Sequence, residues 1–593
     1  MALIVQKFGG TSVADSQKIL AAARKAIRAQ QQGKQVVMVV SAMGHQTDLL
    51  VDLAEQITDR PSPREMDMLL STGEQVSVAL MAMAIHSLGY QAVSLTGAQI
   101  GIRTDSKHTK ARIRSISTDR MQRLLDAGNI VIAAGFQGID EEFNITTLGR
   151  GGSDTTAVAL AAVLNAAECE IYTDVDGVYT TDPRLLPEAR RVGRISYDEM
   201  LELASLGAGV MHNRSIEFGK KFGVPIHVRS SMTDTPGTMI VAEPENAQQP
   251  VCGAAMTRDE ARVTVFGVRD VPGSSRKIFS PIAARNIAVD MIVQNVGEHG
   301  RADISFTVPK KELRPTLEAI ADAVREVGAD GVTSDENVAK VSVVGLGMAR
   351  QTGVANRMFR SLADAGVNIQ MITTSEIKIS VLVASDDALK ALRFVHAAFQ
   401  LHQEPPAVGA PTAVTAARPR DAAAVIARLQ GLDMEELTID DVALDESQAR
   451  VTIAGVPDTP GVAANVFEEV ARAGVFVDMI VQSYHGQRDQ ATLSFTVPAA
   501  KRQEALQVVE RLSKSLNCQG VTSSPHIAKL SVSGVGLRSH TDVAIRMFRA
   551  LSESGINVEM INTSEVRVNV VVDGQHGLSA RDALQRAFSD VLR

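Results

Sequence analysis

Up to about residue 245 the chain alternates short β-rich runs with segments of helical period. Leu3 to Phe8 predicts a strand, and Asp15 to Gln30 predicts a helix with Ile19 and Ala23 on its apolar face. Further strands are expected at residues 36–41, 130–134 and 171–173, with glycine-bearing turns after them. This order predicts a doubly wound α/β unit with a mainly parallel sheet, in which ligands bind where strands end.

The C-terminal half repeats itself. The segment Met358–Leu362 returns as Met547–Leu551, 189 residues later, and Thr374-Ser375-Glu376 returns at the same offset. Each copy is itself double, because Gly273 returns as Gly353, 80 residues later. We therefore expect four α+β modules of the βαββαβ type, at residues 262–337, 338–401, 449–525 and 526–593. The proline- and alanine-rich segment 402–424 is expected to be a linker.

Composition narrows the class of protein. A chain of 593 residues with 45% hydrophobic and 22% charged residues is typical of a soluble multidomain protein. The N-terminus does not resemble a secretion signal, and no apolar run approaches the length of a membrane span, so we predict a cytoplasmic protein without membrane partners. A net charge of −8 without a basic block gives no indication of nucleic-acid binding. The three cysteines are widely spaced, which favours free thiols.

The first strand leads directly into the heptad Lys7-Phe8-Gly9-Gly10-Thr11-Ser12-Val13. Adjacent glycines let backbone amides approach a phosphate, and a lysine can neutralise the charge of a phosphoryl group in transfer. The spacing is not that of a Walker loop. Taken alone, the segment is equally consistent with a plain turn between a strand and a helix.

Three further motifs resolve this ambiguity: Gly73-Glu74, the segment 147–154 (TLGRGGSD) and the segment 173–184 (TDVDGVYTTDPR). Together with the heptad they resemble the aspartokinases of the amino-acid kinase family. The resemblance implies an amino-acid kinase type sandwich over residues 1–245. It also implies transfer of the γ-phosphoryl of ATP to the side-chain carboxylate of L-aspartate, the first step toward lysine, threonine and methionine. Mg²⁺ would be bound mainly through the nucleotide phosphates, so we predict no metal ligand.

The resemblance also assigns site residues. Lys7 and Asp154 are expected to be catalytic, with Asp154 orienting Lys7 or the metal-bound phosphates, because an ionised carboxylate needs no base. Arg150 is expected to grip the substrate α-carboxylate, and Glu74 its ammonium. The full predicted substrate set is Ser41, Thr47, Glu74, Arg150 and Ser153, and the predicted ATP set is Lys7, Gly9, Gly10, Thr173, Asp174, Tyr179, Thr180, Asp182 and Arg184. Ser153 can equally be a helix N-cap, and Asp176-Gly177 a tight turn.

One segment departs from the family pattern. Many members have a second lysine ahead of a Leu-His-Pro-like turn, whereas this chain has Gly209 in the run from Gly207 to Arg214. Arg184 or Lys7 would then have to neutralise more of the phosphate charge.

The four modules resemble ACT domains, which bind amino acids, and the family's effectors are lysine and threonine. Modules one and three are the better candidates, because module four has Asp542 where module two has Gly353. Their predicted effector residues are Asp270, Gly273, Ser275, Asp290, Gln294 and Asn295 in module one, and Asp458, Gly461, Asp478 and Gln482 in module three. Such modules pair edge to edge between chains, so a homodimer is expected.

Two other functions stay open at this point. One is a kinase for glutamate, acetylglutamate, carbamate or UMP, and the other is a catalytically inactive amino-acid sensor. We expect no fusion to homoserine dehydrogenase, because the sensor modules leave no room for a dinucleotide-binding domain in these residues.

Overall fold

The computed structural model describes residues 1–593 except 208–209, 297–299, 406–433, 486–489, 538 and 541. Most of the predicted linker, and Gly209, therefore lie outside the described residues. The three cysteines are free, as predicted; Cys169 is buried, whereas Cys252 and Cys518 are partly exposed.

The N-terminal half is built on an eight-stranded sheet with the order β10-β12-β11-β9-β1-β2-β6-β3. All neighbours are parallel except the pair of β11 and β12, which confirms the predicted mainly parallel sheet. The predicted strands are present. The bounds are β1 (Leu3–Phe8), β2 (Gln35–Val40), β3 (Ala92–Leu95), β6 (Ile130–Ala134), β9 (Glu168–Thr173), β10 (Arg194–Ser196), β11 (Ile226–Ser230) and β12 (Thr238–Val241).

Side-chain alternation along β1 divides the core into two layers. Ile4 and Phe8 pack with α1 (Ser16–Gln31) and α3 (Pro63–Ser87), whereas Leu3 and Val5 pack with α6 (Gly152–Val163). The same alternation places Lys7 on the face that α6 covers. Other elements of this half are α4 (Gly97–Ile100), α5 (Asp119–Asp126), α7 (Tyr197–Ser205) and α8 (Asn213–Phe222), and a smaller sheet of β5 (Ile113–Ile116), β4 (Ile102–Thr104), β7 (Gln137–Ile139) and β8 (Ile145–Thr147).

Among the described residues one helix, α3, is long and apolar enough to cross a membrane by length and composition alone. It contacts α1, β3, β6 and β8 within the N-terminal half, and it buries Asp67 and Glu74. These contacts are those of a core helix.

The first module pair shares two long strands. β13 (Gly253–Arg269) pairs through residues 253–257 with the end of β16 (Gly331–Val344), and through residues 260–266 with its beginning. Module one is thus nested within module two, whose sheet includes a strand from before residue 262. The other elements are α9 (Ser274–Ala284), β14 (Asp290–Val296), β15 (Arg301–Val308) and α10 (Leu313–Glu326) in module one, and α11 (Val354–Asp364), β17 (Met371–Thr374), β18 (Lys378–Ala384) and α12 (Ala388–Ala398) in module two.

The second pair repeats this nesting. β19 (Thr438–Asp445) precedes module three along the chain but pairs with β24 (Ile527–Val535) of module four. The expected βαββαβ order is confirmed. Module three contains β20 (Gln448–Pro457), α14 (Val462–Arg472), β21 (Ile480–His485), β22 (Gln490–Pro498), α15 (Arg502–Ser515) and β23 (Gly520–Ser524); module four contains α16 (Val543–Glu553), β25 (Met560–Thr563), β26 (Arg567–Asp573) and α17 (Gly577–Ala587).

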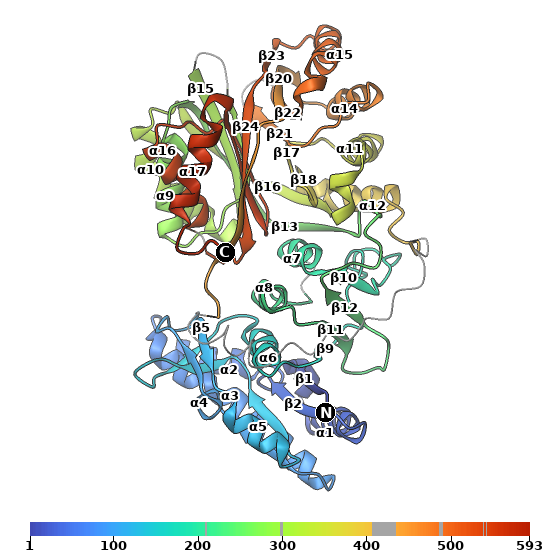
Figure 1. The fold of residues 1–593 in the computed structure, drawn as a ribbon, viewed down its shortest axis with the longest axis vertical. Helices are drawn as coiled ribbons and strands as arrows, with labels where there is room; N and C mark the ends of the chain where they lie inside the picture. The colour runs from blue at the N-terminus through green and yellow to red at the C-terminus, as the bar shows by residue number, and fades with distance from the viewer. Residues whose placement is uncertain (208–209, 297–299, 406–433, 486–489, 538, 541) are drawn as a thin grey trace.

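The four modules pair within one chain. β17 of module two pairs antiparallel with β21 of module three, and β14 of module one contacts β25 of module four. In Figure 1 the strands lie together in the middle, with helices of modules one and four on one side and helices of modules two and three on the other. Met291, Met371, Met479 and Met560, one from each module, share a core cluster.

This arrangement corrects the reasoning behind the predicted homodimer. The strand edges that were expected to pair with another chain pair with modules of the same chain instead. A homodimer stays a prediction, but these edges no longer require one.

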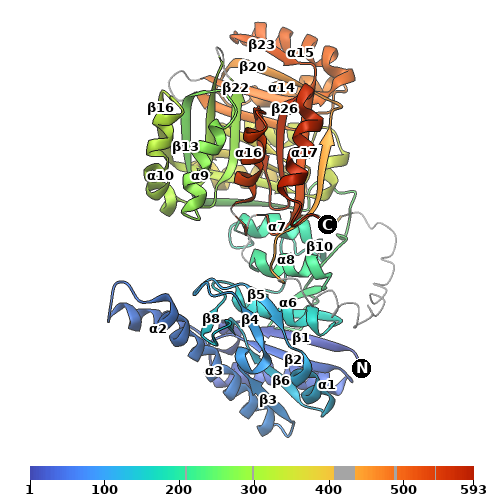
Figure 2. The same ribbon diagram turned by 60° about the vertical axis from the view of Figure 1, so that its left-hand side comes forward.

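Helices α7 and α8 connect the two halves. In Figures 1 and 2 they lie between the rest of the N-terminal half and the strands of the modules. Lys378 at the start of β18 forms a buried ion pair with Glu202 of α7, at 2.8 Å. Glu202 also accepts a hydrogen bond from the backbone amide of Glu565, whose carboxylate accepts one from Asn213 of α8. Polar groups of modules two and four thus meet on the same helices.

Candidate active site

The carboxyl ends of β9, β1, β2 and β6 lie side by side in the sheet, and the predicted site residues gather there. Lys7 at the end of β1 points to the first turn of α6, where its Nζ lies 2.6 Å from Oδ1 of Asp154. Both side chains are 11% exposed. A lysine and an aspartate at this depth hold each other in place while the ammonium keeps a route to solvent.

The second glycine of the heptad, Gly10, is required by close packing. A Cβ on Gly10 would lie 2.7 Å from the carbonyl oxygen of Ala42, and the carbonyl of Gly10 accepts a hydrogen bond from the amide of Gly44. A Cβ on Gly9 would lie 3.5 Å from Nζ of Lys7. The turn after β1 therefore fits tightly against the turn after β2, and it keeps the space beside Lys7 clear of side chains.

The segment 147–154, which leads into α6, lies on the other side of Lys7 from the glycine turn. Gly149 and Gly151 both have positive φ, and a Cβ on Gly151 would lie 2.2 Å from Cβ of His212. Arg150, between them, is exposed at the start of α6. Ser153 is buried against Gly135, where a Cβ would lie 2.6 Å from its Oγ, and no side-chain N-cap bond is present at this helix. Ser153 therefore lies in the first turn of α6, beside the end of β6, and the N-cap of this helix is Gly151.

Glu74 has the unusual environment of the site. It is 4% exposed, one carboxylate oxygen accepts a hydrogen bond from the amide of Ala42 at 3.1 Å, and the other has no hydrogen-bond partner among the described residues. Burial raises the pKa of Glu74 to about 7, although the hydrogen bond from Ala42 lowers it. An unsatisfied buried carboxylate oxygen suits a cationic ligand.

Ser41 and Thr47 flank this corner. Ser41 follows β2 directly, and its amide donates to the carbonyl of Phe8. Thr47 lies in the first turn of α2 (Gln46–Glu55), which packs on α3 through Leu50 beside Gly73. Both residues are partly exposed.

Most of the predicted ATP-binding residues lie on the turn after β9. Thr173 donates to Asp174 at 3.0 Å, and Tyr179 donates to Asp176 at 2.8 Å. Asp182 and Arg184 form an ion pair in which the arginine side chain is 88% exposed. These groups are accessible to a ligand.

Thr180 differs from the rest of the predicted ATP set. Its side chain is 1% exposed and forms a hydrogen bond with Nε2 of His396, on α12 of module two, at 3.0 Å. The structure thus places Thr180 in the contact between the two halves.

Two residues of this region were not found by sequence reasoning. Asp67 is fully buried on α3, two helical turns before Glu74, and accepts hydrogen bonds from the hydroxyl of Thr147 and the amide of Thr109. Through the hydrogen bond from Thr147, Asp67 holds the start of the segment 147–154 in place. His212 packs on Gly151, and burial lowers its pKa. The seven-residue spacing of Asp67 and Glu74 on one apolar helix was the available signal for the first; the second had none.

The predicted effector residues of modules one and three divide between two environments. Asp270 accepts from Asn557, and Gln294, which also accepts from Ser275, donates to the carbonyl of Val558. In module three Asp458 accepts from Asn368, and Gln482 donates to the carbonyl of Ile369. Each set contacts a neighbouring module. Gly273 and Gly461 begin helices α9 and α14 nearby. The side chain of Asn295 lies outside the described residues.

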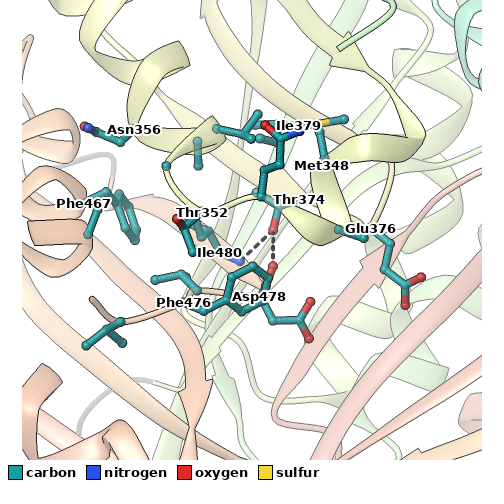
Figure 3. Close-up of a pocket in the computed structure, with 18 of the residues that line it drawn as sticks. Met348, Thr352, Asn356, Thr374, Glu376, Ile379, Phe467, Phe476, Asp478 and Ile480 are labelled. Carbon is teal, nitrogen blue, oxygen red and sulfur yellow. Dashed lines mark hydrogen bonds between the residues drawn. The ribbon is translucent and has the colours of Figure 1, made fainter. Parts of the chain in front are cut away.

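Asp290 and Asp478 lie in the second environment, each paired with a lysine, Lys340 and Lys529 respectively. Asp478 lines a cavity of about 270 Å³ between modules two and three, together with Gly353, Asn356 and Glu376. In Figure 3 the hydroxyl of Thr374 bonds to the carbonyl of Asp478 and the amide of Ile480, at 3.2 and 2.8 Å. This cavity thus lies at the α11 turn of module two, whereas the sequence favours modules one and three as effector sites.

One group of described residues has the spacing of a metal site: Glu168, Glu170 and His227. Lys34 pairs with Glu168, and Arg229 pairs with Glu170 at 2.7 Å. Because cations already neutralise both carboxylates, this donor set does not fit a divalent ion. It is not part of the site around Lys7.

Comparison with known proteins agrees with this geometry. Residues 2–230 match the model of the amino acid kinase family, and ACT domain matches cover residues 263–324, 341–399, 451–512 and 530–588. An aspartate kinase of Stutzerimonas stutzeri is 52% identical over 403 residues, which are 68% of this chain and 98% of that protein. The chain belongs to the aspartate kinase family. An aspartokinase of Geobacillus stearothermophilus is also 52% identical, over 409 residues, 69% of this chain and 100% of that protein.

Solved aspartate kinase structures match as well. The aspartate kinase of Synechocystis is 40% identical with a TM-score of 0.53, and the match covers 99% of this chain and 98% of that one. Escherichia coli aspartokinase III in complex with aspartate and ADP is 26% identical with a TM-score of 0.58, covering 67% of this chain and 99% of that one. The chain is an ATP-dependent aspartate kinase with four ACT domains. The third of the chain that the shorter relatives leave unmatched is close in length to one 189-residue repeat.

The ionisation of Glu74 gives a testable pH dependence. Because its pKa is raised to about 7, the carboxylate that would bind a substrate ammonium forms only as the pH rises through that value. We expect kcat/KM for aspartate to rise about tenfold per pH unit below about pH 7 and to level off above it. Glu74→Gln should lower kcat/KM and flatten the profile.

Steady-state kinetics between pH 5.5 and 8.5 (roughly the range over which such a group titrates) would measure this. Glu217→Gln is a matched control, because burial also raises the pKa of Glu217 to about 7 but its carboxylate accepts from Ser539. A profile of Glu74→Gln that kept the wild-type slope would contradict the assignment.

Proposed function

We propose that this aspartate kinase transfers the γ-phosphoryl of Mg-ATP to the side-chain carboxylate of L-aspartate at the Lys7–Asp154 pair, giving 4-phospho-L-aspartate for lysine, threonine and methionine synthesis. The observation that supports this most is the position of the pair, at the strand ends, with a glycine turn on one side and α6 on the other. The aspartate and ADP bound to E. coli aspartokinase III are consistent with it. We also expect the enzyme to be cytoplasmic.

In the reaction an oxygen of the aspartate side-chain carboxylate forms a bond to the γ-phosphorus, and the bond from that phosphorus to the β–γ bridging oxygen breaks. ADP leaves with the electron pair. No proton transfer is required, because the acceptor carboxylate is ionised at neutral pH. Catalysis then consists of positioning and charge neutralisation. Lys7 is suited to the charge that develops on the transferred group, and Asp154 fixes the direction of its ammonium.

Aspartate would be oriented at both ends of its backbone. The free oxygen of Glu74 is suited to the ammonium, and the exposed guanidinium of Arg150 to the α-carboxylate. Ser153, Ser41 and Thr47 line the same corner. The turn from Thr173 to Arg184 would hold the nucleotide, without Thr180.

Mg²⁺ would be held mainly by nucleotide phosphates and water. The nearest predicted catalytic carboxylate, Asp154, is already paired with Lys7, so the residues do not form a protein cage. When bound, the ion would neutralise phosphate charge beside that of Lys7.

The direct experiment is to incubate the intact chain with Mg-ATP and either aspartate or glutamate, and to trap acyl phosphate with hydroxylamine. We expect product from aspartate and, because the site orients a four-carbon acid, kcat/KM for glutamate at least about 100-fold lower. A chain that hydrolyses ATP without preferring either acceptor would support an inactive sensor instead.

The role of Asp154 is tested by Asp154→Asn. The variant keeps the size of the side chain but leaves Lys7 without its charged partner, so kcat should fall about 100-fold and ATP affinity should also decrease. Asp198→Asn is a matched control, because Asp198 pairs with Lys220 at 2.7 Å on the same half of the molecule. Full turnover with unchanged nucleotide affinity in Asp154→Asn would show that the role is wrong.

We further propose that lysine binds in the cavity between modules two and three as a feedback inhibitor. The amides at the start of α11 are suited to its α-carboxylate. Glu376 and Asp478 pair with Arg567 and Lys529 in this structure, so the two ammonium groups of lysine would bind these carboxylates by displacing those partners. Lysine is bound to the E. coli enzyme in its T-state structure. Threonine suits the smaller pocket lined by Asp458, Asn368 and Gln482.

This proposal predicts a charge-dependent response. Glu376→Gln removes one carboxylate that would bind an ammonium group of lysine. The lysine concentration needed for inhibition should therefore rise about tenfold, and so should the lysine concentration needed to stabilise the protein against heat. Asp458→Asn, in the smaller pocket, should leave the lysine response unchanged and weaken that to threonine. Thermal shift and inhibition curves measure both, and the opposite pattern would exchange the two assignments.

A further inference from the structure

The chain that enters module four is attached to the catalytic half. Residues 434–436, called the strap below, run along the edge strand β5: the amide of Met434 donates to the carbonyl of Arg114 at 3.1 Å, and that of Glu435 to Ile113 at 3.3 Å. The amide of Ile113 in turn donates to the carboxylate of Glu435. Met434 is 2% exposed and belongs to the core of the catalytic half.

Glu435 is held by Arg214 of α8. The guanidinium donates from Nε at 3.0 Å and from Nη2 at 2.6 Å to Oε2 of Glu435. The side chains are 15% and 9% exposed. A two-point pair at this depth fixes the orientation of the guanidinium far better than a surface pair would.

The other side of the same guanidinium contacts the segment 147–154. Nη1 of Arg214 donates to the carbonyl of Leu148, and Nη2 donates to the carbonyl of Ala111 at 2.9 Å. Leu148 is two residues before Arg150. One planar cation therefore joins the strap to the turn that presents Arg150.

The strap is also joined to the sensor modules. β19 begins at Thr438, which pairs with Val535 at the end of β24. The residues just beyond, Leu537 and His540, line a cavity between modules one and four. A change in that cavity can therefore reach Glu435 through the pairing of β24 with β19 and through the short segment of chain that joins β19 to the strap.

We infer that Arg214 is a positioning residue for aspartate binding, and that Glu435 of the strap sets its position according to the state of the second module pair. The pair acts through the carbonyl of Leu148 and not by touching substrate. The affinity for aspartate, and the change of that affinity with effectors, should therefore both depend on the ion pair of Arg214 and Glu435. The affinity for ATP should not depend on it. The inference rests on the proposed placing of aspartate at Arg150.

Glu435→Gln tests this with little change of shape. We expect the KM for aspartate to rise about tenfold and the KM for ATP to change less than about twofold, with inhibition by lysine and threonine weakened. Glu559→Gln is the matched control, because Glu559 pairs with Arg450 at 2.7 Å with similar burial but joins modules three and four only. It should leave both KM values unchanged.

Arg214→Lys is the second variant, since it keeps the charge and loses the two-point geometry. Combined with Glu435→Gln it should add little further effect, because the two residues act as one unit. Hydrogen exchange of the peptide containing residues 147–152 should increase in both single variants and not in the control. These readouts separate a positioning role from a general loss of stability. A general loss of stability would lower the melting temperature of the two single variants and of the control.

Equal changes in both KM values, or no change in Glu435→Gln and Arg214→Lys, would overturn the inference. Arg150→Gln distinguishes that result from failure of the proposed site. If Arg150→Gln raises the KM for aspartate and the pair variants do not, only the inference fails. If Arg150→Gln also has no effect, the placing of aspartate is wrong.

Discussion

Repulsion between the triphosphate of ATP and the carboxylates of aspartate is the constraint on which the catalytic half depends. The parallel sheet meets it by ending four neighbouring strands at one edge, so that a lysine from one strand, a serine from the next and the start of α6 converge there. The alternation that sends Leu3 and Val5 to the α6 side also sends Lys7 to Asp154. Packing and chemistry are thus fixed by one short strand.

Much of this could be predicted from local sequence. The strand from Leu3 to Phe8, the glycine turn after it and the fourfold repeat all depend on patterns within a few residues or at fixed offsets, and the structure confirms each. The family motifs identify Lys7 and Asp154, and of the two partners expected for Asp154 the structure shows the contact with Lys7. Thr180 shows the limit of this reasoning, since Tyr179 and Asp182 of the same predicted set are partly exposed whereas Thr180 contacts His396, 216 residues away.

What could not be predicted depends on contacts between distant segments. No motif marks Asp67 or His212, whose importance comes from what they touch. The nesting of modules, with β13 and β19 contributing to sheets other than those of their neighbours along the chain, also has no local signal. The effector residues of one module divide between two environments for the same reason, because Gln294 bonds to Val558 of module four whereas Asp290 pairs with Lys340 of β16.

The pairing of all four modules inside one polypeptide has a kinetic meaning. A sensor whose halves come from separate chains must associate before it can respond, so its sensitivity varies with enzyme abundance. Here β17 and β21 are tethered, and their local concentration is set by the connecting residues and not by expression level. An effector response that depends only on these contacts would therefore not change with enzyme concentration.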